Sequence, residues 1–315
     1  KDIIIQDSSI IRLHESLANL WPATRSTRVA AGIKVSCIVS VVADGVKSVK
    51  LFPERTSEVK TLNIGPWVRD RIFLIDLGFF KYGVFDRIDK YHGSFVSRLK
   101  SNANPTIVQL TRTCRGNSIS VEGKKLKDVL PHLKRGILDV MVEVKFKRRK
   151  YRGKRTTVTK LVRVVAVLNE ETGDYHIYMT NIPVTRLSAE DIASLYGARW
   201  EIEMVFKELK SYYRMDQINS KNTDIIKSLV WVSILTLMCS RRVLQLIRNV
   251  DPEKANRYTH LRWAKVFGEN AHQLLKEVLE SMGMHLDMSV LYDIYLNHGC
   301  DPNIRRERLK KDWVD

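Results

Sequence analysis

Several features that would place this chain in a familiar class are scarce or absent. The 315 residues contain four cysteines, Cys37, Cys114, Cys239 and Cys300, which lie far apart and form no CxxC pair. That spacing supports neither a zinc ribbon nor a disulfide framework, and free thiols suit a reducing cytoplasm. The sequence also has no Walker loop, GxGxxG motif, internal repeat or signal peptide. The sequence therefore gives no indication of a disulfide scaffold or of a nucleotide-binding loop.

Long hydrophobic runs are also missing. The most apolar stretch, residues 228–240 (SLVWVSILTLMCS), is too short to span a bilayer and is followed by Arg241 and Arg242. It predicts a buried core helix. No lipidation motif accompanies it, and a basic peripheral membrane protein is the weaker alternative. We expect no membrane association.

Acidic residues are outnumbered by basic ones. The chain has 53 Lys and Arg against 35 Asp and Glu, a net charge of +18, which favours a polyanionic partner such as nucleic acid. Ten basic residues lie between Lys145 and Arg163. A solvated hairpin tip or a charge-guarded edge strand would explain them, but their density favours a surface that contacts phosphates without reading sequence. The predicted contacts are Lys147, Arg148, Arg149, Lys150, Arg152, Lys154 and Arg155.

Two apolar runs end on an acid. DIIIQD ends at Asp7 and RIFLID ends at Asp76, and each predicts a short buried strand. Functional side chains gather where parallel strands end, so both aspartates are candidates for a site. Asp7 could instead cap a helix in the segment that follows it. Between them, residues 33–43 and 48–52 flank an Asp-Gly turn and predict a hairpin.

A long helix is predicted from Ser188, the N-cap of the capping box SAED, to about Tyr213. At 100° per residue it carries a polar stripe beside an apolar one. The polar stripe consists of Tyr196, Arg199, Glu203 and Lys210. The apolar stripe consists of Leu195, Ile202, Val205, Phe206 and Leu209. Spacing alone would also fit a solvated face with helix ion pairs, and Trp200 at the margin could either stack on a base or pack.

The polar stripe has the spacing of a known signature. Tyr, two residues, Arg, three residues, Glu, six residues and Lys resembles the YREK signature of the IS4-family DDE transposases. The words RWEIE and FKELK are similar to that family, as are the segments around Asp7 and Asp76. The resemblance covers most of residues 1–250. Family members carry a helical DNA-binding region before the first aspartate, whereas six residues precede Asp7 here.

The resemblance implies a ribonuclease-H-like α/β fold. Such a fold has a mixed sheet flanked by helices, here with a strand-rich insertion and a helical C-terminal region. We expect the first part of the catalytic core at residues 1–100 and a basic insertion at 101–185. The second part of the core is expected at 186–250, and the C-terminal helices at 251–315.

The same resemblance implies a catalytic site. Asp7, Asp76 and Glu203 would hold two Mg²⁺ ions, with Mn²⁺ able to substitute, because Mg²⁺ prefers oxygen ligands. Arg199 and Lys210 would neutralise phosphates, and Tyr196 would donate a hydrogen bond to one.

The expected function is DNA transposition. The protein would cleave transposon ends and join them to target double-stranded DNA, as a homodimer in a synaptic complex, in the nucleoid-containing cytoplasm of a prokaryote. Two alternatives stay open. One is a metal-dependent DNA nuclease that does not join, and the other is a non-catalytic DNA-binding protein of the same fold.

Overall fold

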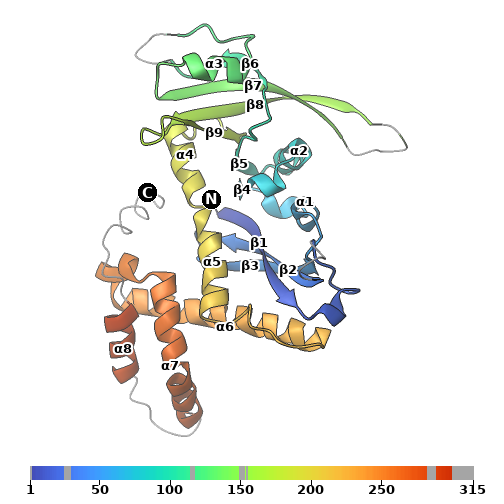
Figure 1. Ribbon diagram of the computed structural model, residues 1–315. Helices are drawn as coiled ribbons and strands as arrows, with labels where there is room; N and C mark the ends of the chain where they lie inside the picture. Colours follow the sequence, from blue (N-terminus) through green and yellow to red (C-terminus); the bar gives the residue numbers. More distant parts are fainter. Residues whose placement is uncertain are drawn as a thin grey trace. The chain divides into compact units, whose positions relative to one another are not determined.

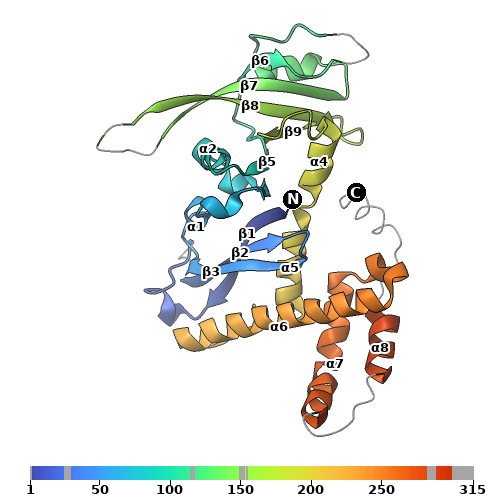
Figure 2. The same ribbon diagram turned by 180° about the vertical axis from the view of Figure 1, so that it is seen from behind.

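The computed structural model describes residues 2–24, 30–113, 118–148, 153, 155–281 and 289–299. The chain forms two compact units, each built from segments that are distant in sequence (Figures 1 and 2). The first unit consists of Lys1–Asp7, Ile38–Ala43 and Ser57–Arg199. The second unit consists of Ser8–Cys37, Asp44–Thr56 and Trp200–Asp315.

Parallel strands form the centre of the first unit. Strand β1 (Ile3–Leu13) pairs in parallel with β4 (Ile72–Ile75), and β4 pairs in parallel with β5 (Ser94–Arg98). All four residues of β4 are buried. Parallel strands are usually covered on both faces, which explains why this segment is an unbroken apolar run in the sequence.

Antiparallel strands continue this sheet beyond β5. They are β6 (Thr106–Leu110), β7 (Ile137–Lys147), β8 (Thr157–Leu168) and β9 (Tyr175–Thr180). Strand β9 pairs with β5, β8 with β9, β7 with β8 and β6 with β7. Val140, Val142 and Val144 are buried on one face of β7, which is the alternation typical of a strand. The predicted strand-rich segment is confirmed.

The nine strands follow the order β3-β2-β1-β4-β5-β9-β8-β7-β6. Strands β2 (Ala31–Ser40) and β3 (Gly45–Pro53) are the predicted hairpin, and Asp44 in its turn has a φ of 49°, a conformation that aspartate tolerates. The order 3-2-1-4-5 with strands 1, 4 and 5 parallel is that of a ribonuclease-H-like sheet. The predicted mixed α/β fold is therefore confirmed.

Short helices and an aromatic core complete the first unit. The α-helices are α1 (Glu58–Thr61), α2 (Tyr82–Lys90), α3 (Leu126–Val129) and α4 (Ala189–Gly197). The 3-10 turns are η2 (Pro66–Val68), η3 (Leu77–Phe79) and η4 (Leu130–His132). Phe85 of α2 stacks on Phe95 of β5 with ring centroids 4.5 Å apart, which holds α2 against the sheet.

Longer helices dominate the second unit. They are α5 (Trp200–Ser211), α6 (Thr223–Val250), α7 (His260–Ser281) and α8 (Ser289–Gly299), with the 3-10 turns η1 (Glu15–Leu17) and η5 (Pro252–Arg257). The predicted C-terminal helices are confirmed. Trp263 is fully buried, packs 4.7 Å from the ring of Tyr295 and donates a hydrogen bond to the Ser240 carbonyl.

Strand β1 corrects one expectation. It continues past Asp7 to Leu13, so Asp7 lies within the strand and does not cap a helix. The physical reason is the pattern after Asp7: Ile11 and Leu13 are buried with an exposed residue between them, which is strand periodicity.

The long helix from Ser188 corrects a second expectation. Its capping box forms as predicted, but Ala198 and Arg199 make a turn that separates α4 from α5. The backbone N–H of Arg199 bonds to the carbonyl of Tyr196, three residues back, at 3.1 Å. The polar stripe is therefore divided between two helices.

Helix α6 contains the predicted core helix of residues 228–240. By length and composition it could cross a membrane, since it extends well beyond the short apolar run. Its buried face, however, carries Ser233, Ser240 and Arg241. A buried arginine paired with Glu208 and Asp44 shows that this face packs inside the second unit. The opposite face is exposed.

Candidate active site

Two carboxylates lie on neighbouring strands of the first unit. The parallel register of β1 and β4 places Gln6 beside Ile75, so Asp7 and Asp76 follow at the next position of each strand. Parallel strands that run in step bring their side chains to the same edge of the sheet. The structure therefore places the two aspartates predicted from the sequence on neighbouring strands.

Backbone and charge both hold Asp76. It is the N-cap of η3, and its Oδ2 accepts a hydrogen bond from the Gly78 N–H at 3.2 Å. Nε of Arg199 lies 3.9 Å from its Oδ1. The Asp76 side chain is still 40% exposed, and that of Arg199 is 19% exposed. The carboxylate is thus anchored but accessible.

Tyr196 lies beside the end of β4. Its hydroxyl is 3.5 Å from the Ile75 carbonyl, and its ring packs 5.4 Å from that of Tyr178. Burial, together with the Asp76 carboxylate, raises the pKa of Tyr196 to about 12. The phenol therefore stays neutral and remains a donor. The residue is only 8% exposed, so it supports the strand end more than it presents a surface.

The structure adds two residues that the sequence interpretation missed. Arg98 ends β5, one strand away from Asp76, and its positive charge opposes the effect of burial on the pKa of both Tyr178 and Tyr196. Tyr178 belongs to β9, which pairs with β5. The available signal was the basic residue that ends the apolar word SFVSR, a placement similar to that of Asp76.

The third predicted carboxylate belongs to the second unit. Glu203 lies in the first turn of α5 and is half-buried. Ile202, Val205, Phe206 and Leu209 form the buried face of this helix, as predicted. Leu195 of the predicted apolar stripe is only half-buried, whereas Tyr196 is buried. The turn at Ala198 and Arg199 explains this difference, because residues before it and after it no longer share one continuous helix and so do not face the same side.

The remaining predicted residues of the stripe lie on α5. Trp200 is 56% exposed, so its indole is free for stacking and does not serve as core packing. Lys210 is half-buried in the last turn.

A buried charge network supports α5 from within the second unit. Glu208 of α5 is fully buried, and its Oε2 accepts hydrogen bonds from Nη2 and Nε of Arg241 at 2.8 and 3.2 Å. Nη1 of Arg241 also reaches Oδ1 of Asp44 at 3.1 Å. Arg248 and His260 each place a nitrogen 2.7 Å from Oδ2 of the same aspartate. The contacts with His260, Arg241 and Arg248 hold the pKa of Asp44 well below its usual range despite its burial.

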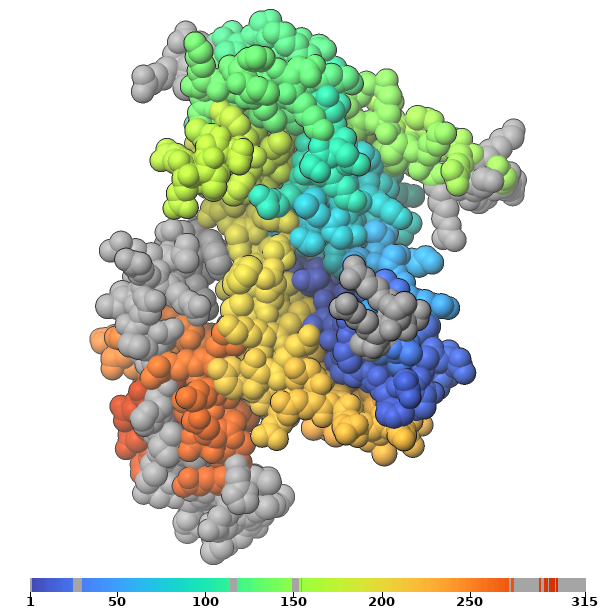
Figure 3. Space-filling view, in the orientation of Figure 1, coloured from blue at the N-terminus to red at the C-terminus, as the bar shows by residue number. Residues whose placement is uncertain are grey.

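The basic hairpin of β7 and β8 is docked on α2. Phe146 stacks on Tyr82 with ring centroids 6.1 Å apart. Nη2 of Arg148 lies 2.9 Å from Oδ2 of Asp86, and Nζ of Lys160 lies 2.6 Å from Oδ2 of Asp89. Figure 3 shows this hairpin projecting from the rest of the first unit. Part of its charge is thus engaged by acids of the same unit.

The predicted phosphate contacts on this hairpin divide into two groups. Lys147 and Arg155 are exposed, and Arg148 is exposed but paired as described. Four others lie outside the described residues: Arg149, Lys150, Arg152 and Lys154. Arg163, counted in the basic run, is buried and makes two hydrogen bonds to Asp139, at 2.9 and 2.6 Å. It is a structural residue, not a phosphate contact.

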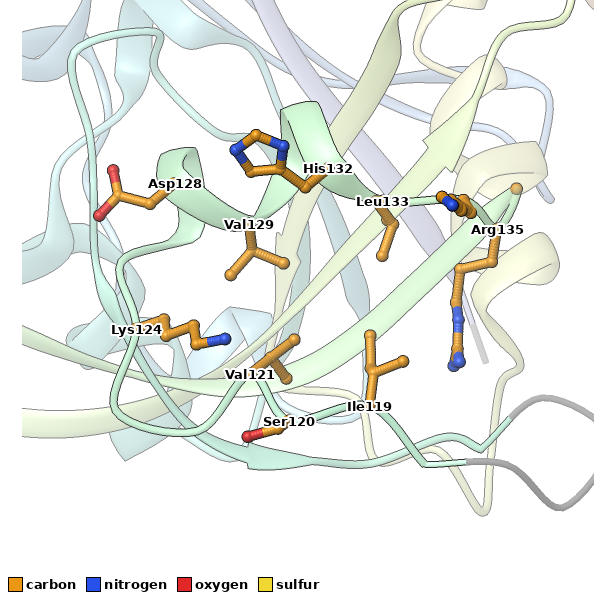
Figure 4. Close-up of a pocket in the computed structure, with 11 residues that line it drawn as sticks. Ile119, Ser120, Val121, Lys124, Asp128, Val129, His132, Leu133 and Arg135 are labelled. Atoms are coloured by element: carbon orange, nitrogen blue, oxygen red, sulfur yellow. The ribbon is translucent and has the colours of Figure 1, made fainter.

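A separate pocket lies in the first unit, in the segment that links β6 to β7. Figure 4 shows its apolar floor, which includes Val121, Val129 and Leu133, and the basic side chains Lys124 and Arg135 at its rim. Its volume is about 620 Å³. It is lined by residues 119–136 alone, and no predicted site residue is among them.

The comparisons with known proteins identify the family. The family model described as "Transposase DDE domain" matches residues 1–239. The chain belongs to this family. It is similar to the transposase of insertion sequence element IS1151 of Clostridium perfringens, with 22% identity over an alignment of 283 residues that covers 80% of this chain and 60% of that protein. It is also similar to the transposase of IS231F of Bacillus thuringiensis subsp. israelensis, with 21% identity over 285 residues, 78% of this chain and 57% of that protein.

The chain thus spans about three fifths of the length of these curated relatives. Among solved structures it aligns with a piggyBac transposase synaptic complex with hairpin DNA, at a TM-score of 0.46 and 10% identity. That alignment covers 96% of this chain and 58% of the other. A likeness of this degree does not by itself establish a shared fold, and the strand order above is the evidence for the fold.

A DDE domain implies dependence on a divalent metal ion. The two aspartates fit such an ion, because Asp7 in β1 and Asp76 just after β4 offer carboxylate oxygens from adjacent strands and Asp76 is accessible. Within the described part of the chain, no three His, Cys, Asp or Glu side chains gather as a ready metal site.

Proposed function

We propose that this protein is a DNA transposase that cuts the ends of a mobile element and joins them to target DNA. The observation that carries the proposal is the pair Asp7 and Asp76 on adjacent parallel strands of a chain that matches the transposase DDE domain. Similarity to insertion-sequence transposases supports it. The finer assignment to the IS4 family rests on the YREK spacing in residues 196–210.

We further propose that Asp7, Asp76 and Glu203 hold the metal, which we take to be a pair of Mg²⁺ ions. When bound, the ions would supply a nucleophile at neutral pH and stabilise the charge that develops on the leaving oxygen. Glu203 is proposed from its place in the signature. Release of Asp76 from Arg199 would accompany metal binding, because a cation 3.9 Å away competes for the same carboxylate.

The chain's own residues would bind and orient the DNA. Arg199, once released, would contact a phosphate near the scissile bond with its planar guanidinium, and Lys210 would add a point charge. Tyr196 would fix the end of β4 and remain a neutral donor at working pH. Trp200 would stack on a base or sugar, which its exposure supports.

Joining activity separates this proposal from its rivals. We expect the full-length parent protein, given Mg²⁺ and a labelled duplex that carries the element's end, to produce both cleaved ends and products joined to a second duplex. Cleaved ends that accumulate without joined products would favour a nuclease. Binding without cleavage in Mg²⁺ or Mn²⁺, unchanged by EDTA, would favour a non-catalytic DNA-binding protein.

The hairpin of β7 and β8 would track the DNA backbone. Replacing Lys147, Arg148 and Arg155 by alanine is expected to reduce the slope of log K against log salt by about 2 to 3, since each phosphate contact contributes roughly 0.9. Binding to all duplex sequences should weaken alike. Fluorescence anisotropy at a series of salt concentrations measures the slope.

The pocket rim provides a matched control for that experiment. Lys124, Lys134 and Arg135 are three cations of the same unit, and their replacement by alanine should change the slope by less than about 1. A pocket variant that loses as much slope as the hairpin variant would show that phosphate contacts are not concentrated on the hairpin.

The cellular setting follows from the same proposal. Double-stranded DNA is the partner, Mn²⁺ would replace Mg²⁺, and two copies of the protein would hold two element ends together. The relatives named above are bacterial, so we place the protein in the bacterial cytoplasm with the nucleoid.

A further inference from the structure

The exposed face of α6 is unusually apolar. Eight large apolar side chains on this helix are each between 42% and 57% exposed. They are Ile225, Leu229, Trp231, Val232, Leu235, Met238, Leu246 and Val250. In Figure 2 the whole length of α6 is visible, with no other helix drawn in front of it. Contiguous apolar patches of this size on a water-soluble surface mark interaction sites.

We propose that this face binds a second copy of the chain, with the two α6 helices antiparallel about a twofold axis. Together the eight side chains expose on the order of 800 Å², which is the area that each partner buries in a standard interface. The proposal deepens the homodimer suggested above, and its residues are separate from the proposed catalytic ones.

Charge explains why two copies would meet here. A protein of net charge +18 repels its own copy over most of its surface. Charged side chains on this face are few: Asp224 and Arg242 are exposed, and the Lys227 side chain is 43% exposed. Two apolar faces with so little charge can approach at low electrostatic cost.

The positions of Asp224 and Arg242 select the antiparallel arrangement. Arg242 follows Asp224 by 18 residues, which is five full turns, so both lie on the same flank of the helix about 27 Å apart. An antiparallel twofold pair centred near Ser233 places Asp224 of each copy opposite Arg242 of the other. A parallel twofold pair would instead bring each charge level with its own copy on the opposite flank, so neither charge would meet its opposite.

The same register fits the apolar residues. With its centre near Ser233, Trp231 of one copy faces Leu235 of the other, twice, at the middle of the interface. An aromatic residue at the centre of a buried patch is the usual anchor of such a contact. In the single chain Asp224 lies 3.4 Å from Lys227, but an exposed pair of this kind contributes little and is easily exchanged.

A charge exchange tests the register. Sedimentation equilibrium of the full chain without DNA should show a dimer. Asp224→Arg and Arg242→Asp should each raise the dimer dissociation constant about tenfold or more, because each creates two like-charge contacts. The double variant should return to within about threefold of the original value. No recovery in the double variant would overturn the antiparallel register.

A second pair of variants tests the face itself. Leu235→Glu should raise the dissociation constant at least about a hundredfold, since it buries two charges at the centre. Val42→Glu, at another exposed apolar residue, should leave it unchanged. Circular dichroism checks that both variants fold. A wild-type chain that is monomeric at about 100 μM, or that instead floats with phosphatidylcholine and phosphatidylglycerol vesicles through this face, would overturn the proposal. Because DNA is absent, neither result bears on the catalytic assignment.

Discussion

Glutamine in place of Glu203 is expected to lower the rate of metal-dependent DNA cleavage by about a thousandfold or more, while DNA binding is kept. The size follows from losing a group that stabilises charge in the transition state through the metal. Glutamine has the shape of glutamate and suits a helix, so α5 should persist. Single-turnover cleavage of a labelled end duplex by the full-length parent measures the rate, and anisotropy measures binding.

Glu201 is the matched control for this substitution. It lies in the same first turn of α5 and has the same charge, but Nδ1 of His260 is 3.9 Å from its carboxylate. Glu201→Gln should keep cleavage within about threefold. Asp76→Asn should lose cleavage as Glu203→Gln does, and Asp70→Asn should not; asparagine tolerates the φ of 57° at position 70. If Glu201→Gln and Asp70→Asn lost cleavage to the same extent, the negative charge of the region would matter and not Glu203 and Asp76 in particular.

Methionine in place of Arg241 is expected to destabilise the second unit by about 3 to 5 kcal/mol. The substitution leaves Glu208 fully buried without its cation. Asp44 is affected less, because Arg248 and His260 still contact it. Urea denaturation measures the change. The exposed Lys265→Met on α7 is the control and should stay within about 0.5 kcal/mol.

The pH dependence of that loss has a defined sign. Burial raises the pKa of Glu208, and Arg241 opposes the rise. Without Arg241 the folded-state pKa is higher still, and a group with a raised folded-state pKa loses stability as the pH rises through that value. The difference between Arg241→Met and the original protein should therefore be smallest in acid and grow with pH.

A second substitution isolates the pair. Glu208→Gln in the Arg241→Met background removes the buried charge, so most of the lost stability should return. An Arg241→Met protein as stable as the original at neutral pH would contradict the assignment of a buried ion pair. So would a double variant no more stable than Arg241→Met alone.

Sequence patterns predicted the sheet around Asp7 and Asp76 well. A short apolar run precedes each aspartate, Ile3 to Ile5 in β1 and Ile72 to Ile75 in β4, and such runs predict buried strands. The Asp-Gly hairpin turn and the SAED capping box also form where predicted, because turns and caps depend on adjacent residues. Pairing of β1 with β4 then brings the aspartates together.

The sequence analysis misplaced the ends of one helix and one strand. Gly197 stands just before the turn that divides α4 from α5, and a glycine near a helix end is a stop signal that the four-residue stripe outweighed. Strand β1 was ended too early because Asp7 was taken as punctuation, although the alternation after it continues to Leu13.

Long-range charge pairs could not be predicted at all. Glu208 interrupts the apolar stripe of α5, and Arg241 follows the apolar run of α6, but nothing local shows that they meet. Arg163 is similar: it belongs to a basic run in the sequence and to a buried pair with Asp139 in the fold. Such pairs depend on which elements pack together, and spacing along the chain carries no information about that.

The central claim is that Asp7, Asp76 and Glu203 share one metal site. Electron paramagnetic resonance of Mn²⁺ measures this directly, with the full-length parent bound to an uncleaved end duplex. We expect tight Mn²⁺ binding in the original protein and in Glu201→Gln, and at least about tenfold weaker binding in Asp7→Asn, Asp76→Asn and Glu203→Gln. Unchanged Mn²⁺ affinity in Glu203→Gln would contradict the claim and leave the two aspartates without their proposed third ligand.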